Sequence, residues 1–301
     1  MPDTNANFAD KLLDAIDAKG SPVCVGIDPR YDRLPKAISA GPDADTSVQL
    51  AKISEFCRQV LEAIAPHVPA VKPQSAYFEA YGAAGVETYY QVVRWAHQLG
   101  LLVIGDAKRN DIGSTAQAYA AGHLAGVDKA DSLTVNAYFG IDGVKPFLDV
   151  CAAEGKGAFA LVRTSNPSAG QVQDFQNADG KKLYQHMADL IAGFGDTPEL
   201  VGRRGYSSLG AVVGATWPDE ARMLRVQMPR QIFLVPGYGA QGASAADCAA
   251  SFKDDGTGAI VNASRSVIFA HTQEQYARLP WQKAIEQAAK AFAQDIRSAL
   301  S

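Results

Sequence analysis

The fold is decided by the stretch Leu101–Thr115, which reads LLVIGDAKRNDIGST. Its apolar first part, Leu101–Gly105, is followed at once by charged side chains. A short apolar run that ends in charges is typical of a buried strand that emerges into solvent at its carboxyl end. Because side chains alternate along a strand, Asp106 and Lys108 point the same way. The stretch therefore predicts a carboxylate beside an ammonium at the mouth of a strand.

A helical pattern begins near Thr115, which leaves a purely structural interpretation open for the charges before it. In that interpretation they form a solvated cluster, and Asp111 is the N-cap of the helix. The stretch alone favours this interpretation, so a functional one depends on matching chemistry at other strand ends.

Similar apolar runs recur along the chain, and helical patterns separate them. The expected strands are residues 23–27, 68–71, 101–106, 132–136, 158–162, 209–214, 232–235 and 259–261. Eight such runs alternating with helices in a chain of 301 residues predict an α/β fold, a (β/α)8 TIM barrel. The alternative is an open doubly wound sheet, but no G-x-G-x-x-G segment follows the first strand.

The helical patterns outside the repeat define the ends of the barrel and one insertion. We expect an amino-terminal helix over 5–19, a long helix over 77–99 and a final helix that begins at Pro280. The polar segment 166–208 is an insertion between strands five and six, with one helix near Leu183. No shift in composition indicates a linker, so residues 1–301 are expected to form a single domain.

Composition excludes several classes of protein. The chain is 47% hydrophobic and 20% charged, as in an ordinary globular protein, and its net charge of −4 argues against general nucleic-acid binding. No apolar run reaches membrane-spanning length, and the start of the chain has no signal-peptide pattern. The cysteines are far apart, without a CxxC pair, so we expect reduced thiols in a cytoplasmic protein. They are Cys24, Cys57, Cys151 and Cys248.

Polar or charged side chains stand where most of the expected strands end. These residues are Asp28, Lys72, Asp106, Lys108, Asn136, Ser165, Gln241 and Arg265. In a barrel all carboxyl ends share one face, where active sites are built. Each residue alone has a structural explanation, such as a turn for Asp28 or a surface position for Lys72. Together they predict alternating carboxylates and ammoniums on one rim.

The last two strands are followed by residues suited to a phosphate group. Gly237, Gly239 and Gly242 let backbone N–H groups approach an anion closely. Ser264 and Arg265 follow the eighth strand, and a guanidinium suits phosphate oxygens. Tight turns are the structural alternative for the glycines. We favour a phosphate site, because barrels often bind phosphate after strands seven and eight.

These motifs resemble the orotidine 5′-phosphate decarboxylase family, over essentially the whole barrel. The family signature D-x-K-x-x-D-I-x-x-T is matched by Asp106, Lys108, Asp111, Ile112 and Thr115. Further matches are Asp28, Lys72, Ser165, the segment Pro236–Gly242 (PGYGAQG) and the pair Ser264–Arg265. The insertions after Asp28 and between strands five and six resemble the longer bacterial group of the family.

The resemblance implies conversion of orotidine 5′-monophosphate (OMP) to UMP and CO2 in de novo pyrimidine biosynthesis, without metal or cofactor. Loss of CO2 leaves a carbanion at C6 of the pyrimidine, which a fixed ammonium can stabilise and then protonate. Lys108 is the candidate proton donor. Asp106 and Asp111 would keep it charged and aimed, and Lys72 would complete the charged network.

The resemblance also implies substrate-binding roles. Asp28 would help to hold the ribose, Ser165 the pyrimidine and Arg265 the phosphate, while Gln241 would link base and phosphate. The full expected set is Asp28, Ile112, Thr115, Asn136, Ser165, Pro236, Gln241, Gly242, Ser264 and Arg265. The resemblance further implies a homodimer in which Asp111, Ile112 and Thr115 reach the partner's site.

Two alternative functions remain open from the sequence. Magnesium-dependent sugar-phosphate decarboxylases and aldolases of the same suprafamily also carry D-x-K-x-x-D, but they have an acidic residue where this chain has Lys72, which would repel the cation. A non-catalytic barrel that binds a phosphate ligand is expected to have lost Lys108 or Asp106, and both are present.

Overall fold

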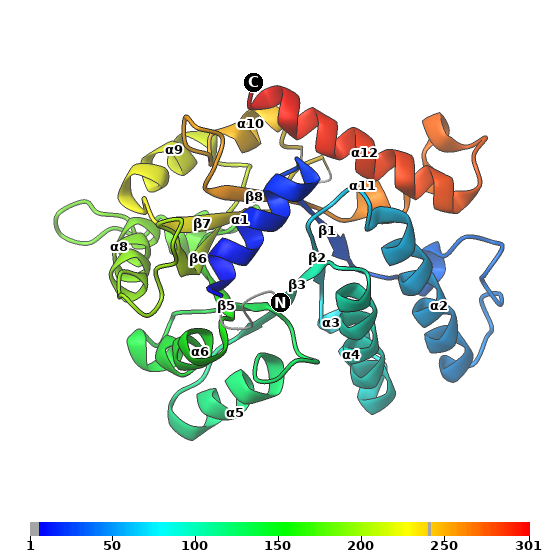
Figure 1. Cartoon of the computed structure of the whole chain (residues 1–301), viewed down its shortest axis with the longest axis horizontal. Coiled ribbons are helices and arrows are strands. Elements are labelled where there is room, and N and C mark those ends of the chain that lie inside the picture. The colour runs from blue at the N-terminus through cyan, green and yellow to red at the C-terminus, as the bar shows by residue number, and fades with distance from the viewer. Residues whose placement is uncertain (1–5, 240–241) are drawn as a thin grey trace.

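The computed structural model describes residues 6–239 and 242–301 and shows a closed barrel of parallel strands (Figure 1). The strands follow one another around the barrel in chain order, and β8 closes it by pairing with β1. They are β1 (Val23–Ile27), β2 (Ala70–Pro73), β3 (Leu102–Arg109), β4 (Ser132–Val135), β5 (Gly157–Arg163), β6 (Ser207–Val213), β7 (Gln231–Val235) and β8 (Ala259–Ala263). The expected (β/α)8 barrel is confirmed, and the open sheet is excluded.

Helices surround the strands in Figure 1. They are α1 (Phe8–Lys19), α2 (Thr46–Ile64), α3 (Ala76–Glu79), α4 (Gly82–Gln98), α5 (Gly113–His123), α6 (Ile141–Glu154), α7 (Gly170–Gln173), α8 (Leu183–Gly195), α9 (Pro218–Gln227), α10 (Ala245–Ala249), α11 (Arg265–Ile268) and α12 (Trp281–Ala299). Short 3-10 turns lie at Tyr31–Arg33, Ala270–Thr272 and Glu274–Tyr276.

The amino-terminal helix α1 lies across the end of the barrel that faces the viewer in Figure 1, the lower end, where the strands begin. Its Phe8 packs edge-on against Phe159 of β5, with ring centroids 6.0 Å apart, inside the cluster that fills the barrel. The buried carboxylate of Asp10 accepts hydrogen bonds from the backbone N–H groups of Arg203 and Arg204, at 2.8 and 2.9 Å. The lower end is therefore closed by side chains, and the upper end is left for a site.

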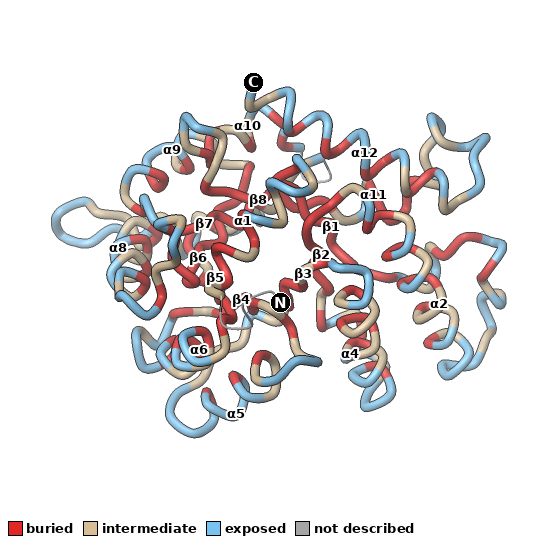
Figure 2. The backbone as a smooth tube through the Cα atoms, viewed as in Figure 1, coloured by how far each residue is buried: buried red, intermediate tan, exposed pale blue. Residues whose placement is uncertain are grey.

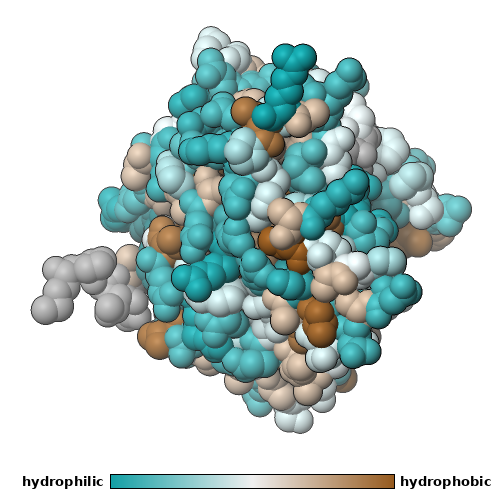
Figure 3. Space-filling view, turned by 90° about the vertical axis from the view of Figure 1, so that its right-hand side faces the viewer, coloured by the Kyte–Doolittle hydropathy of each residue, from teal (hydrophilic) through white to brown (hydrophobic). Residues whose placement is uncertain are grey.

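Alternation along the strands creates two hydrophobic cores. Side chains such as Ile104, Phe159 and Ile260 fill the barrel interior, while Val103, Val135 and Val261 face the surrounding helices. The strands are accordingly buried on both sides, and Figure 2 shows most of their length in the colour of buried residues. The helices are amphipathic and turn their polar faces outward, so the face in Figure 3 is mostly hydrophilic with small separate hydrophobic areas.

Three local expectations were wrong. Strand β3 does not end at Asp106 but continues to Arg109 through a shift of register against β4. The helix expected over 77–99 is split into α3 and α4, because the chain takes a left-handed conformation at Gly82, with φ of 65°. The insertion between β5 and β6 holds α7 as well as the expected helix, and a single turn is too short to give a periodic pattern.

Candidate active site

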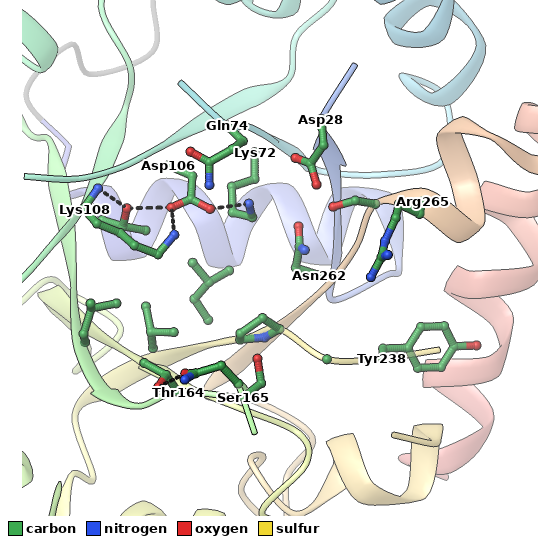
Figure 4. A pocket seen from close by; sticks show the side chains of 18 residues that line it. Asp28, Lys72, Gln74, Asp106, Lys108, Thr164, Ser165, Tyr238, Asn262 and Arg265 are labelled. Atoms are coloured by element: carbon green, nitrogen blue, oxygen red, sulfur yellow. Dashed lines mark hydrogen bonds and ion pairs between the residues drawn. The ribbon is translucent and has the colours of Figure 1, made fainter. Parts of the chain in front are cut away.

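The carboxyl ends of the strands surround a pocket of about 480 Å³ (Figure 4). Its lining residues are Asp28, Lys72, Gln74, Asp106, Lys108, Thr134, Leu161, Thr164, Ser165, Asn166, Val212, Leu234, Pro236, Gly237, Tyr238, Asn262, Ser264 and Arg265. The structure thus brings together nine of the residues expected from the sequence: Asp28, Lys72, Asp106, Lys108, Ser165, Pro236, Gly237, Ser264 and Arg265.

The pocket is the upward continuation of the barrel interior. Lys72, Asp106 and Asn262 stand two positions beyond the interior residues Ala70, Ile104 and Ile260 on the same strands. Gln74, Thr134 and Asn262 line the pocket but were not expected from the sequence, because the expectation rested on charged side chains just after the strands. The alternation itself, extended by two residues, would have found them.

Asp106 is the centre of the charged group. Lys72 Nζ donates to Asp106 Oδ2 and Lys108 Nζ donates to Asp106 Oδ1, both at 2.6 Å (Figure 4). The hydroxyl of Thr134 donates to Asp106 Oδ1 at 2.9 Å. One buried carboxylate therefore holds two ammonium groups and one hydroxyl in fixed positions.

The pKa values of this group follow from burial and charge acting in opposite directions. Burial favours the neutral form of Lys72, but the attraction of Asp106 and Asp28 outweighs it and raises the pKa of Lys72 above its usual value. Burial likewise favours neutral Asp106, but Lys72 and Lys108 hold its pKa below the usual range. The pair Lys72–Asp106 therefore stays ionised at neutral pH.

The two lysines differ in exposure. The side chain of Lys72 is 7% exposed, whereas that of Lys108 is 46% exposed and faces the pocket. A proton donor must reach the reacting atom, and a buried counter-ion need not. The geometry therefore suits Lys108 to meet a substrate and Lys72 to hold Asp106.

The conformation at the end of β3 is unusual and is held by Thr134. Among the described non-glycine residues, only Lys108 has a positive φ, of 49°. The hydroxyl oxygen of Thr134 accepts hydrogen bonds from the backbone N–H groups of Ala107 and Lys108, at 3.1 and 3.0 Å. Thr134 thus fixes both the backbone turn that aims Lys108 and the carboxylate that Lys108 contacts.

Two further polar residues come from β1 and β8. Asp28 lines the pocket, and its Oδ1 is buried without a hydrogen-bond partner among the described residues. Burial raises the pKa of Cys24 to about 12, so this thiol stays protonated and donates to Asn262 Oδ1 at 3.4 Å. A Cβ at Gly26 would lie 1.9 Å from Ser264 Oγ, so the glycine is what lets Ser264 lie over β1.

The rim formed by β7 and β8 holds the expected phosphate residues. Pro236, Gly237, Ser264 and Arg265 line the pocket, with Arg265 on the side of Asp28 and Asn262 in Figure 4. Gly242 is exposed and is not part of the lining. Gln241 lies outside the described residues, so its expected role stays a prediction.

Besides Gly242, four expected site residues do not line this pocket: Asp111, Ile112, Thr115 and Asn136. Asn136 Oδ1 instead accepts a hydrogen bond from the backbone N–H of Tyr138 at 3.0 Å, which fixes the loop after β4. Asp111 is not the N-cap of α5, since that position is Ile112, whose N–H donates to Asp111 Oδ1 at 2.8 Å. Ile112 is 54% exposed.

Neither a metal-binding cluster nor a membrane-spanning helix occurs among the described residues. Within 6–239 and 242–301, no group of three or more His, Cys, Asp or Glu side chains is arranged to hold a metal ion. In the same part of the chain, no helix combines the length and apolar character needed to cross a membrane.

Comparison with known proteins identifies the family. A model described as "Orotidine 5'-phosphate decarboxylase / HUMPS family" matches residues 21–279. The chain belongs to this family. Among curated relatives, the orotidine 5′-phosphate decarboxylase of Rhodopirellula baltica is 44% identical over 293 residues, covering 93% of this chain and 96% of the relative. That of Deinococcus radiodurans is 40% identical over 293 residues, covering 97% and 98%.

Solved structures agree with this assignment. The OMP decarboxylase of Leishmania donovani superposes with a TM-score of 0.76 at 30% identity and covers 98% of each chain. The chain is therefore a carboxy-lyase that decarboxylates OMP in pyrimidine biosynthesis. The magnesium-dependent alternative and the non-catalytic barrel are not favoured, because the curated relatives carry the decarboxylase name and Lys108 and Asp106 both line the pocket.

Proposed function

We propose that Lys108 protonates C6 of the pyrimidine after CO2 leaves. The bond from C6 to the carboxylate carbon breaks, its electron pair stays on C6, and the Nζ proton of Lys108 moves to C6. The observation that supports this assignment is the arrangement of two ammoniums on one carboxylate, with only Lys108 substantially exposed to the pocket. A fixed ammonium stabilises the developing negative charge without reorganisation during the reaction.

The remaining lining residues are proposed to bind the rest of the nucleotide. Asp28 and Lys72 are proposed to hold ribose hydroxyls, and Ser165, which lies across the pocket from them in Figure 4, is proposed to contact the pyrimidine. Arg265 is proposed to bind the phosphate. Binding energy from that remote group can support catalysis at C6.

Replacing Lys108 tests the proposed proton donor. Lys108→Ala should lower kcat for OMP by more than about 10⁴-fold, since both acid catalysis and charge stabilisation are lost. The matched control is Lys145→Ala, which removes an exposed lysine paired with Asp149 on α6. Turnover close to wild type in folded Lys108→Ala protein would remove Lys108 from the mechanism.

We further propose a homodimer with shared active sites. Asp111, Ile112 and Thr115 match the family signature but do not line the pocket of their own chain. Close to them, Tyr138 and Phe139 are 78% and 49% exposed, with ring centroids 6.0 Å apart. Adjacent exposed apolar side chains support an interface with a second copy, which would receive these residues in its own pocket.

Subunit exchange tests the shared site. A mixture of Lys108→Ala and Asp111→Ala proteins should regain roughly a quarter of wild-type activity, because about half of the dimers are mixed and each mixed dimer has one intact site. The matched control mixes Lys108→Ala with Asp106→Ala. Both residues belong to the pocket of their own chain, so every site of a mixed dimer has one defect and the mixture should regain nothing. No recovery in the first mixture, with exchange confirmed independently, would contradict the shared site.

Two broader proposals complete the function. We propose that residues 1–301 form a single domain, which the family match over 21–279 and the packing of α1 and α12 on the barrel support. We also propose a cytoplasmic location, supported by four buried, unpaired cysteines, since free thiols persist in a reducing compartment.

A further inference from the structure

The side chain of Arg163, at the carboxyl end of β5, is among the largest fully buried side chains of the described chain and does not line the pocket. It is 1% exposed. A buried guanidinium is costly unless ion pairs and ring faces replace its water. Arg163 stands directly before Thr164 and Ser165, which do line the pocket. The question is what the protein gains by burying a charge at this position.

The contacts of Arg163 come from three separate segments. Its Nη1 lies 3.1 Å from Asp174 Oδ1, and its Nη2 lies 3.6 Å from Glu220 Oε1 at the start of α9. Its guanidinium carbon lies 4.7 Å from the ring centroid of Tyr184 on α8 and 4.2 Å from that of Trp217. The insertion between β5 and β6 and the segment after β6 therefore meet at one side chain.

The same segments bind every polar group of Thr164. Gln173, next to Asp174, accepts from the Thr164 N–H at 3.0 Å and donates to its hydroxyl at 2.6 Å. The indole N–H of Trp217 donates to the Thr164 carbonyl at 3.0 Å. Trp217 contacts both Arg163 and Thr164, and Gln173, which bonds to Thr164, is next to Asp174, which pairs with Arg163. Moving the guanidinium would therefore release the Thr164 backbone.

Ser165 is fixed from the β6 side as well. The N–H of Gly214 donates to the Arg163 carbonyl at 2.8 Å. A Cβ at Gly214 would lie 2.9 Å from the Cβ of Ser165, so the Ser165 backbone packs directly on β6. The segment that faces the pocket thus has little freedom as long as both sides hold.

We infer that Arg163 is a positioning residue for the known reaction: it joins the insertion to the end of β5 and so fixes Thr164 and Ser165 against the pyrimidine. This inference rests on the proposed contact of Ser165 with the base. It also gives the insertion a function, because α7 and α8 supply Gln173 and Tyr184. Arg163 touches no substrate and acts only through its neighbours.

Binding of two ligands tests the inference, because only one of them carries a base. Arg163→Met should weaken UMP binding about tenfold, as expected when a fixed hydrogen-bonding group loses its position, while ribose 5-phosphate affinity stays within about twofold. KM for OMP should rise together with the loss of UMP affinity. Equal loss for both ligands, or no loss for UMP, would overturn the inference.

Arg225→Met is the matched control. Arg225 is also a buried guanidinium, 3.9 Å from the centroid of Phe233, but it bonds to the carbonyls of Met228, Gln231 and Gly258 near the amino ends of β7 and β8. Its loss removes comparable packing far from the pocket. Arg225→Met should leave the ratio of the UMP and ribose 5-phosphate affinities unchanged. A changed ratio would mean that the difference between the two ligands reflects general destabilisation, and it would overturn the inference.

Two more variants keep the test decisive. If Arg163→Met does not fold, Trp217→Phe keeps a ring for stacking but removes the N–H to Thr164, and it should weaken UMP binding a few-fold with ribose 5-phosphate unaffected. Unchanged UMP affinity in Trp217→Phe would then overturn the inference. Ser165→Ala separately tests the base contact, so a failure of the proposed function is distinguishable from a failure of the positioning role.

Discussion

The two ends of the pocket are built on different principles. At the ends of β2, β3 and β4, the polar groups bond to one another, with Asp106 holding Lys72, Lys108 and Thr134. At the ends of β7 and β8, Arg265 is exposed and forms no ion pair within residues 6–239 and 242–301. The first region is organised before substrate arrives, whereas the second offers its charge to a ligand. We therefore expect changes in the first region to lower kcat and changes in the second to weaken binding.

Of the changes that test this comparison, the largest effect is expected from neutralising Asp106, the carboxylate at the centre of the first region. Asp106→Asn keeps the shape but leaves two ammonium groups facing each other without a counter-ion, one of them buried. We expect kcat for OMP to fall about 10³-fold, because Lys108 loses its fixed position, while UMP binding changes far less. Steady-state kinetics and UMP titration separate the two quantities. A loss confined to UMP binding would show that the centre binds rather than catalyses.

A change at the other end should have the opposite signature. Arg265→Ala removes charge-assisted hydrogen bonds worth about 1.5–3 kcal/mol, so UMP affinity should fall roughly 10- to 150-fold. Calorimetric titration measures this, and uridine, which lacks the phosphate, serves as the control ligand with unchanged affinity. If UMP binds as tightly as before, the phosphate site lies elsewhere.

The smallest effect is expected from replacing Thr134, which tests how the first region holds Asp106 and Lys108. Thr134→Val keeps the volume but removes the hydroxyl that contacts Asp106 and the N–H groups of Ala107 and Lys108. We expect kcat to fall at least about fivefold with UMP affinity unchanged, since each lost hydrogen bond of the network is worth about 1 kcal/mol. Thr88→Val, on the surface of α4, is the matched control. Equal kcat in both variants would show that Thr134 does not aim Lys108.

The sequence predicted the barrel and the charged centre well, because both depend on local order. Apolar runs gave the strands, and alternation placed Asp106 and Lys108 on one face. It could not predict the bulge in β3, since a shift of register depends on which residue of β4 lies opposite. Alternation could have placed Thr134 in the pocket, but it could not predict the function of this residue, which exists only through contacts with β3, remote in sequence.

Arg163 shows a different limit. Its charge, next to Thr164 and Ser165, gives no sign that it points away from the pocket. Its partners Asp174, Tyr184 and Glu220 are brought to it by the insertion and by α9. Such a cluster depends on tertiary packing, and no spacing rule along the chain describes it.

The position of α1 has a consequence for the traffic of molecules through the enzyme. Because Phe8 and its neighbours fill the lower end of the barrel, molecules reach the pocket from the carboxyl ends of the strands. OMP enters, and CO2 and UMP depart, through the same opening. The proton that Lys108 gives up must be replaced from water at that opening as well. Slow release of UMP through this opening therefore delays both the binding of the next OMP and the reprotonation of Lys108.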